Sequence, residues 1–298
     1  MVATRRLTEL VAATLSRSAF PDGRLVVGLS GGADSAALAH LALAAGAEVR
    51  ALHIDHGLPG SAMMSAAAEE VAGTLGIDLE TVTLELGRGP SLEEQARDAR
   101  YAVFDRIDGP VLTGHTRDDN AETVLLNLIR GTGPAGLAGI PPYRPPVVYR
   151  PILDVTRAET REISGLAGLA FRDDPMNDDP GLTRNRVRQQ LLPLMSSMNP
   201  RVVDSIARTA SAVRADVDFL DSTIDHIDLS GGLAASLVLT LPPALGDRLL
   251  ARLLARSGVG VTSDRLARAR DVAATPAGRQ DLADGLTVSR RGALIVVE

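Results

Sequence analysis

Residues 25–35 read Leu-Val-Val-Gly-Leu-Ser-Gly-Gly-Ala-Asp-Ser, and this stretch decides the fold class. Residues 25–29 form an apolar, valine-containing run, which predicts a short buried strand. Two glycines then form a turn, and the apolar pattern of residues 36–45 predicts a helix. A strand, a glycine turn and a helix in this order are typical of the opening of an α/β domain.

The same alternation of strand and helix continues to residue 153. Further strands are predicted at residues 49–54, 79–86, 110–114 and 147–153. Helices are predicted between them at residues 61–75, 91–107 and 118–129, and a capping box at Ser91 begins the second of these. We therefore expect an α/β fold: a doubly wound, parallel, five-stranded sheet with helices on both faces. Ligands of such sheets bind beyond the carboxyl ends of the strands.

Helices dominate the pattern after residue 153. They are predicted at residues 156–169, 183–198, 200–227, 246–255 and 263–273, and a terminal β-hairpin is predicted at residues 286–289 and 294–297. We therefore expect two domains. Residues 1–200 would form the α/β domain, and residues 201–298 a second, smaller and mostly helical C-terminal domain.

The composition excludes several classes of site. The 298 residues contain no cysteine and no lysine, so all 31 cationic side chains are arginines. Thiolate metal sites, a cysteine nucleophile and a lysine Schiff base are thereby excluded. The net charge of −6 is not that of a non-specific nucleic-acid binder. No apolar run approaches the ~20 residues of a membrane span, so we expect no membrane partner and a cytoplasmic location.

The turn after the first strand carries residues suited to binding phosphate. Gly31 and Gly32 let the backbone approach a ligand closely, and the amides at the start of the helix attract an anion. Ser30 and Ser35 offer hydroxyl groups to phosphate oxygens, whereas Asp34 can hold a bridging Mg²⁺ ion. The segment resembles the SGGxDS pyrophosphate-binding loop of the PP-loop (N-type) ATP pyrophosphatases.

This resemblance implies that ATP binds to the residues of the loop, which are Ser30, Gly31, Gly32, Ala33, Asp34 and Ser35. It also implies a reaction in which diphosphate leaves and AMP is joined to an oxygen of the substrate. The loop by itself does not identify the substrate that is adenylated.

The end of the second strand carries a second motif, His-Ile-Asp-His-Gly-Leu at residues 53–58. A metal site of His53, Asp55 and His56 is one interpretation, but alternation along a strand puts His56 on the opposite face from the other two. The segment resembles the HxDHGL element of tRNA(Ile)-lysidine synthetases and of related tRNA thiolases. That resemblance implies that His53 and Asp55 lie beside the nucleotide.

A third motif covers residues 114–133, Gly-His-Thr-Arg-Asp-Asp-Asn-Ala-Glu-Thr-Val-Leu-Leu-Asn-Leu-Ile-Arg-Gly-Thr-Gly. A capped helix explains the acidic residues of its first turn, but not the histidine before it or the arginine after it. The stretch resembles the GHxxDDxxETxLLxLxRGxG signature of the same two branches. The resemblance implies that Gly114 lies beside ATP, that Arg130 contacts a phosphate, and that the lysine substrate and the base are bound by His115, Asp118, Asp119 and Glu122.

A series of motifs between residues 150 and 193 separates the branches of this superfamily. It comprises Arg-Pro-Ile-Leu at residues 150–153, Arg-Ala-Glu at 157–159, Asp-Asp-Pro-Met-Asn at 173–177 and Thr-Arg-Asn-Arg-Val-Arg-Gln-Gln-Leu-Leu-Pro at 183–193. Three arginines in five residues would by themselves fit a solvated helix face. In order and spacing, however, the series resembles that of the tRNA(Ile)-lysidine synthetase family, which usually has serine or threonine in place of Met176. The resemblance implies that Arg184, Arg186 and Arg188 hold phosphates of tRNA or AMP.

The resemblance covers residues 24–200 and implies a function. The family adenylates the C2 oxygen of the wobble cytidine in the CAU anticodon of tRNA(Ile), and free L-lysine then displaces AMP to form lysidine. The implied catalytic residues are Asp34, which would also bind Mg²⁺, with His115, Asp119 and Arg186. The C-terminal domain, with cationic residues such as Arg248, would contact the tRNA away from the anticodon. Compact members are often dimers, so a homodimer is one expectation.

Three alternatives stay open beside this hypothesis. A tRNA thiolase of the same fold would use cysteines, which the chain lacks. A small-molecule adenylating amide synthetase would account for the glycine loop but not for the later motifs. A non-catalytic nucleotide-binding module would need neither the third motif nor the arginine cluster.

Overall fold

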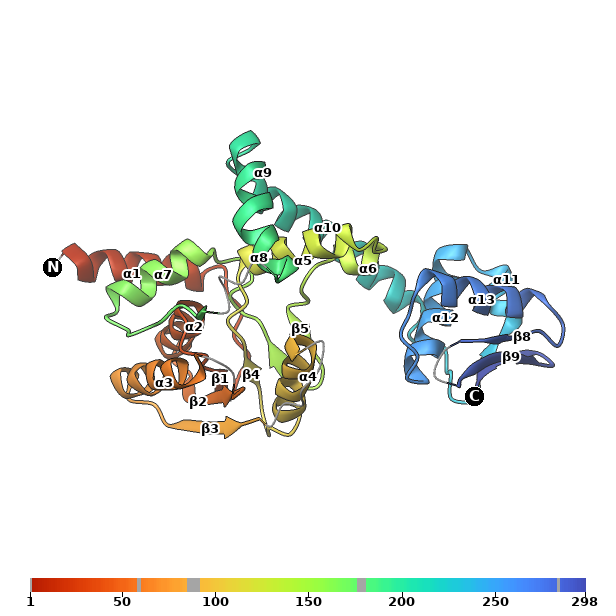
Figure 1. Ribbon diagram of the computed structural model, residues 1–298, viewed down its shortest axis with the longest axis horizontal. Helices are drawn as coiled ribbons and strands as arrows, with labels where there is room; N and C mark the ends of the chain where they lie inside the picture. Colours follow the sequence, from red (N-terminus) through yellow and green to blue (C-terminus); the bar gives the residue numbers. More distant parts are fainter. Residues whose placement is uncertain (1, 58–59, 85–91, 176–180, 283–284) are drawn as a thin grey trace. The chain divides into compact units, whose positions relative to one another are not determined.

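The computed structural model describes residues 2–57, 60–84, 92–175, 181–282 and 285–298 (Figure 1). It divides into two compact units, Met1–Ala212 and Val213–Glu298. The division falls within helix α10 (Val202–Ile224), whereas the sequence analysis places it before this helix, at residue 200. No helix in the described part of the chain is long and apolar enough to cross a membrane.

The first unit is built on a six-stranded sheet. In spatial order its strands are β3 (Leu79–Thr83), β2 (Glu48–Asp55), β1 (Arg24–Gly28), β4 (Val111–Leu112), β6 (Val148–Tyr149) and β5 (Tyr143–Arg144). All neighbouring pairs from β3 to β6 are parallel, which confirms the predicted five parallel strands. The sixth strand, β5, pairs antiparallel at the edge, and its two residues are too few to show a period in the sequence.

The main helices of this unit that follow the first strand lie where the sequence predicts them, and one further helix precedes that strand. Together they are α1 (Val2–Leu15), α2 (Ala33–Ala44), α3 (Ser61–Leu75), α4 (Leu92–Phe104), α5 (Arg117–Ile129) and α7 (Arg157–Leu166). Capping boxes at Thr116 and Thr156 begin α5 and α7. In each box the threonine hydroxyl accepts a hydrogen bond from the backbone amide of the third helical residue. Ser91, predicted to cap α4, lies outside the described residues, as do Met176 and Asn177.

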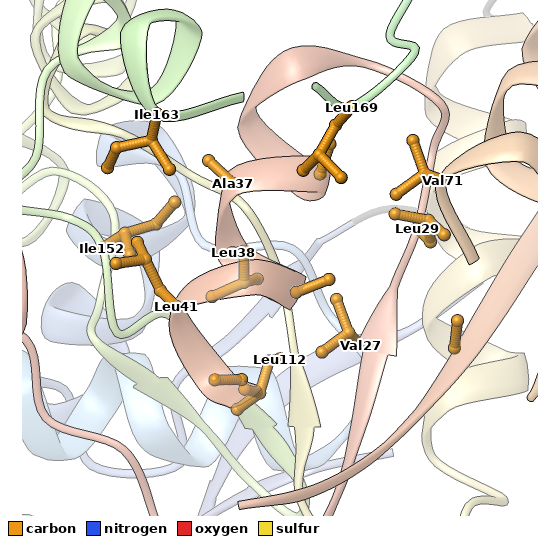
Figure 2. Packing of buried hydrophobic residues seen from close by; sticks show 14 of the residues in the cluster. Val27, Leu29, Ala37, Leu38, Leu41, Val71, Leu112, Ile152, Ile163 and Leu169 are labelled. Atoms are coloured by element: carbon orange, nitrogen blue, oxygen red, sulfur yellow. The ribbon is translucent and has the colours of Figure 1, made fainter. Parts of the chain in front are cut away.

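Two hydrophobic clusters cover the two faces of the sheet. Alternation along β1 turns Val27 to one face and Val26 to the other. The Val27 cluster contains Leu38 of α2 and Ile163 of α7, both fully buried (Figure 2). The Val26 cluster contains Phe104 of α4. The glycine turn after β1 is thus fixed from both faces of the sheet.

The segment predicted as one helix over residues 183–198 is irregular. It consists of α8 (Thr183–Arg186), the π-helical turn η2 (Val187–Leu191) and α9 (Leu192–Met198). A π-helical turn inside a helix is frequent at functional sites, because it changes which side chains share a face. A short helix, α6 (Pro134–Leu137), also follows α5.

The second unit combines helices with a four-stranded antiparallel sheet. Its strands, in spatial order, are β7 (Leu233–Ala234), β10 (Leu294–Val297), β9 (Thr287–Arg291) and β8 (Arg279–Asp281). The helices α11 (Ala235–Thr240), α12 (Pro243–Arg256) and α13 (Ser263–Ala274) share one hydrophobic core with the sheet. The predicted terminal hairpin corresponds to β9 and β10, and the short strands β7 and β8 extend it on both sides.

Candidate active site

A cavity of about 490 Å³ lies at the carboxyl ends of β1, β2 and β4. Its lining includes Asp34 from the first motif, His53 from the second, His115 and Asp119 from the third, and Arg184 from the fourth. Four segments that are distant in the sequence therefore meet at the edge of the sheet where ligands of parallel α/β folds bind.

The lining of this cavity is rich in positive charge. Among the described residues it holds seven arginines and four aspartates. The arginines are Arg97, Arg100, Arg157, Arg161, Arg172, Arg184 and Arg188. A concave surface with this excess of guanidinium groups attracts polyanions such as nucleotides.

The first motif forms a tight loop at the start of α2. The Ser30 amide donates to Ser35 Oγ over 3.1 Å, and Ser35 Oγ donates to the Gly32 carbonyl over 3.0 Å. Gly31 has a φ of +84°, and a Cβ there would lie 2.3 Å from the Met64 carbonyl oxygen. Gly32 provides no side-chain cap for α2. The first amides of this helix therefore have no side-chain cap and can receive an anion.

The loop after β4 packs directly on the start of α2. A Cβ on Gly114 would lie 3.0 Å from both Asp34 C and Ser35 N. A side chain at this position would separate the third motif from the first. Gly114 also lines the cavity, and its place beside the nucleotide stays a prediction.

Asp34 occupies the first turn of α2 and lines the cavity. Its side chain is 27% exposed, with Oδ2 3.8 Å from Arg157 Nε. The hydroxyl of Thr160 donates to Oδ1. Burial raises the pKa of Asp34 to about 6, against the opposing effects of Thr160 and Arg157.

Glu122 is the centre of a buried ion cluster. Its side chain is 0% exposed and accepts hydrogen bonds from three arginines. Arg188 Nε lies 2.7 Å from Oε1, Arg184 Nε lies 2.9 Å from Oε2, and Arg157 Nη1 lies 3.1 Å from Oε1. Burial raises the pKa of Glu122, but Arg188 and Arg157 outweigh this effect and keep the net shift downward.

Asp119 joins the same cluster one turn earlier on α5. Its Oδ2 accepts from the amide and the hydroxyl of Thr116, at 2.9 and 2.8 Å. Its Oδ1 lies 2.9 Å from Arg157 Nη2 and 3.2 Å from Arg184 Nη2. Burial opposes ionisation, yet the two arginines hold the pKa of Asp119 well below its usual range. The Asp118 carboxylate instead accepts a hydrogen bond from the backbone amide of Arg157, over 2.8 Å.

His115 lines the same cavity as the glycine loop and Asp119. Its Nδ1 is 3.0 Å from Thr113 Oγ1. Burial lowers the pKa of His115, and this effect exceeds the opposite effect of Asp119. The imidazole is therefore neutral at pH 7, and burial makes it a weaker base than a solvent-exposed histidine.

His53 and Asp55 are placed differently from one another. His53 lines the cavity, but its Nδ1 lies 2.8 Å from the Leu29 carbonyl and its Nε2 lies 2.9 Å from Ser65 Oγ. Both ring nitrogens thus connect the end of β1 to α3. Asp55 accepts the Gly57 amide over 2.8 Å and does not line the cavity.

Two of the predicted phosphate-binding arginines lie outside the cavity. Arg184 and Arg188 both point into the site, one turn apart, whereas Arg186 is exposed. Two positions along a helix correspond to roughly half a turn, so Arg186 faces away from its neighbours. Arg130, just after α5, is also exposed and does not line the cavity.

Comparison with known proteins identifies the family. Residues 2–195 match the model of the PP-loop domain. The tRNA(Ile)-lysidine synthase of Nocardia farcinica is 40% identical over 260 residues, which cover 84% of this chain and 81% of that protein. The enzyme of the same name from Salinispora arenicola is 38% identical over 328 residues, covering 100% of this chain and 96% of that protein. The chain belongs to the tRNA(Ile)-lysidine synthase family.

Membership of the lysidine synthase family confirms the resemblance seen in the motifs. Lysidine synthases are ATP-using ligases that form a C–N bond, and the chain is an enzyme of this kind. Among solved structures, the U34-tRNA thiolase NcsA from Methanococcus maripaludis has a similar fold, with a TM-score of 0.55 over 76% of this chain and 80% of that one. At 19% identity this similarity concerns the fold alone.

Several residues around this site were not among the predicted site residues, and four of them have clear positions. Arg157 joins Asp34 to the ion cluster, and Thr160 contacts Asp34 from α7. Arg97 and Arg100 line the cavity from α4. Among the described residues, no carboxylate forms an ion pair with either α4 arginine. Their spacing of three residues, which puts both on one helix face, was the only signal in the sequence.

Proposed function

We propose that this lysidine synthase family member modifies the wobble cytidine in the CAU anticodon of tRNA(Ile). In the first step, the C2 oxygen of cytosine bonds to the α-phosphorus of ATP and diphosphate leaves. In the second step, the amine of free L-lysine bonds to C2, the C2–O bond breaks and AMP leaves. The amine loses a proton in this step, so the site needs a base as well as a phosphate-binding loop.

One observation carries this proposal: the glycine loop, His115, and Asp119 with its arginine partners line the same cavity. The loop at the start of α2 suits the phosphates of ATP. Asp119 and His115 lie beside it and can contact the amine and the activated base. The seven arginines of the lining neutralise the charge of two polyanionic substrates.

The residues at the loop fit a Mg²⁺ ion that is shared with the nucleotide. Among the described residues, no group of three or more His, Asp or Glu could hold a metal without other ligands. Asp34 offers one carboxylate at the start of α2, and Mg²⁺ in nucleotide sites is commonly held by one or two carboxylates and substrate phosphates. Asp34 would therefore hold the ion, which would neutralise the leaving diphosphate.

The acidic residues divide into two roles. Asp119 lines the cavity and would contact the lysine amine, and neutral His115 would accept its proton. Glu122 is fully enclosed by arginines, and Asp118 is bound to the Arg157 amide. These two carboxylates would hold the arginines and α7 in place for the substrates.

The arginines also divide by position. Arg184 and Arg188 line the cavity and would bind phosphates of ATP or AMP, with Arg97 and Arg100 on the facing wall. The exposed Arg130 and the exposed Arg186 would contact tRNA phosphates at the surface. The enzyme would act in the cytoplasm, where its tRNA substrate occurs, and it would assemble as a homodimer.

The test is a labelling reaction with the full chain, Mg²⁺, ATP and radioactive lysine. One sample contains the CAU tRNA(Ile) transcript, and its control contains the same transcript with the wobble C changed to U. We expect acid-precipitable label on the first tRNA alone, and none with Asp34→Ala. Diphosphate release without label on tRNA would instead favour a small-molecule adenylating synthetase or another tRNA modification.

A further inference from the structure

Helix α7 and the residues after it hold the glycine loop through three hydrogen bonds. The hydroxyl of Thr160 donates to Asp34 Oδ1, and Ser164 Oγ donates to the Ala33 carbonyl over 2.9 Å. The Arg172 amide donates to the Gly31 carbonyl over 2.9 Å. These contacts fix consecutive parts of the loop from a segment more than a hundred residues later.

The two hydroxyl groups form a matched pair on one face of α7. Thr160 and Ser164 are one helical turn apart, both are 0% exposed, and neither lines the cavity. Ile163 beside them packs into the hydrophobic cluster that contains α2. A buried hydroxyl needs a hydrogen-bond partner, so their positions on this apolar face depend on the loop groups that they contact.

The contact of Thr160 distinguishes the two oxygens of Asp34. Oδ1 is held by the threonine hydroxyl, whereas the partner of Oδ2 in the described part of the chain is the more distant Arg157 Nε, at 3.8 Å. A carboxylate with one oxygen fixed presents its other oxygen in a defined direction. The Thr160 hydroxyl also lies 2.9 Å from the Arg157 carbonyl, so its single proton can turn toward either acceptor.

We propose that Thr160 is a positioning residue, which orients Asp34 so that Oδ2 is available to the divalent cation that accompanies the nucleotide phosphates. This inference rests on the proposed role of Asp34 as a metal ligand. Hydrogen bonds that orient a metal-ligating group are worth about 10- to 100-fold in metal affinity. The arrangement assigns to α7 a share in cation binding, although α7 supplies no ligand through Thr160 itself.

The experiment compares Thr160→Val, which keeps the shape but loses the hydroxyl, with Thr160→Ser, which keeps the hydroxyl. Binding of Mn²⁺ to the full chain with a non-hydrolysable ATP analogue is measured by electron paramagnetic resonance. We expect Thr160→Val to weaken Mn²⁺ binding about tenfold and Thr160→Ser to restore it to within about twofold of wild type. The Mg²⁺ concentration for half-maximal diphosphate release should rise in parallel, with little change in the KM for lysine.

Thr14→Val is the matched control. Thr14 is equally buried in the same unit, and its hydroxyl has no hydrogen-bond partner among the residues that the structure describes, so its loss should leave metal binding unchanged. If Thr160→Val does not fold, Thr160→Ala removes the same hydroxyl with a smaller side chain and carries the same expectation.

Two results would overturn the inference: wild-type metal affinity in the variants without a hydroxyl, or equal weakening in Thr160→Ser. Absence of metal-dependent nucleotide binding in the wild type would overturn it as well. Failure of the proposed function is a separate result. If metal binding depends on Thr160 but no label appears on the tRNA, the role of Thr160 stands and the proposed tRNA substrate is wrong.

Discussion

At the scale of single residues, the site is dominated by charges that compensate one another. Glu122 is fully buried, and Arg157, Arg184 and Arg188 surround it with side chains that are 23%, 28% and 25% exposed. The resemblance to the lysidine synthetase signature implied that this carboxylate binds the lysine substrate or the base. The structure places it behind the cavity, where it holds the arginines together. A buried charge with good partners is costly to break, because removing one partner leaves the others unpaired.

Glu122→Gln should therefore destabilise the chain strongly. We expect the free energy of unfolding to fall by about 3 kcal/mol, because three arginines lose their common partner. The measurement is urea unfolding followed by circular dichroism. Glu162→Gln is the matched control, since Glu162 pairs with Arg6 at the surface and should be close to neutral. Equal decreases in the free energy of unfolding of the two variants would contradict the conclusion that the ion cluster stabilises the fold.

At the scale of elements, the glycine loop and its neighbours determine the geometry of the cavity. The loop lies between β1 and α2, with α3 behind Gly31 and α7 bound to Asp34. His53 joins the end of β1 to α3 through both ring nitrogens. A histidine that the motif placed beside the nucleotide thus also supports the loop on which the nucleotide is proposed to bind.

Gly31→Ala tests this packing, and Gly46→Ala is its control. Both glycines have a φ of +84°, but a Cβ at Gly46 meets nothing within 4 Å. Gly46→Ala should cost about 1 kcal/mol through backbone strain alone. Gly31→Ala should cost about 1–3 kcal/mol more, because its Cβ overlaps the Met64 carbonyl, and it should abolish ATP binding. Thermal unfolding and nucleotide titration measure both effects, and similar losses in the two variants would exclude a steric role for α3.

At the scale of the whole chain, the arginines differ in whether a carboxylate already compensates their charge. The net charge is −6, so contact with RNA depends on local groups of arginines. In the second unit, four of the arginines expected to contact tRNA pair with aspartates: Arg248 with Asp221, Arg252 with Asp225, Arg268 with Asp264 and Arg270 with Asp247. In the first unit, Arg186 is exposed, with no carboxylate partner among the described residues.

Arg186→Gln should consequently weaken tRNA binding more than Arg248→Gln does. Loss of one phosphate contact lowers the slope of log K against log salt concentration by about 1, and we expect this change for Arg186→Gln. Arg248→Gln should leave the slope unchanged, because its charge is compensated by Asp221 at 3.0 Å. Filter binding over a range of salt concentrations measures both slopes. A larger change for Arg248→Gln would locate the tRNA contacts in the second unit.

The order of strands and helices along the chain, the glycine loop and the family could all be predicted from local sequence. These properties depend on local periodicity and on motifs such as residues 30–35, in which a few neighbouring residues carry the signal. The strands β5 and β7 were not predicted, because each has two residues, which are too few to show a period.

Only the tertiary structure decided which charged groups meet. Arg184 and Arg188 reach Glu122 across more than sixty residues of sequence, and Thr160 reaches Asp34 across 126. Arg186, in the same motif, turns outward. The physical reason is that a side chain's partner depends on how its helix is rotated and packed against elements distant in the sequence, and a motif specifies neither.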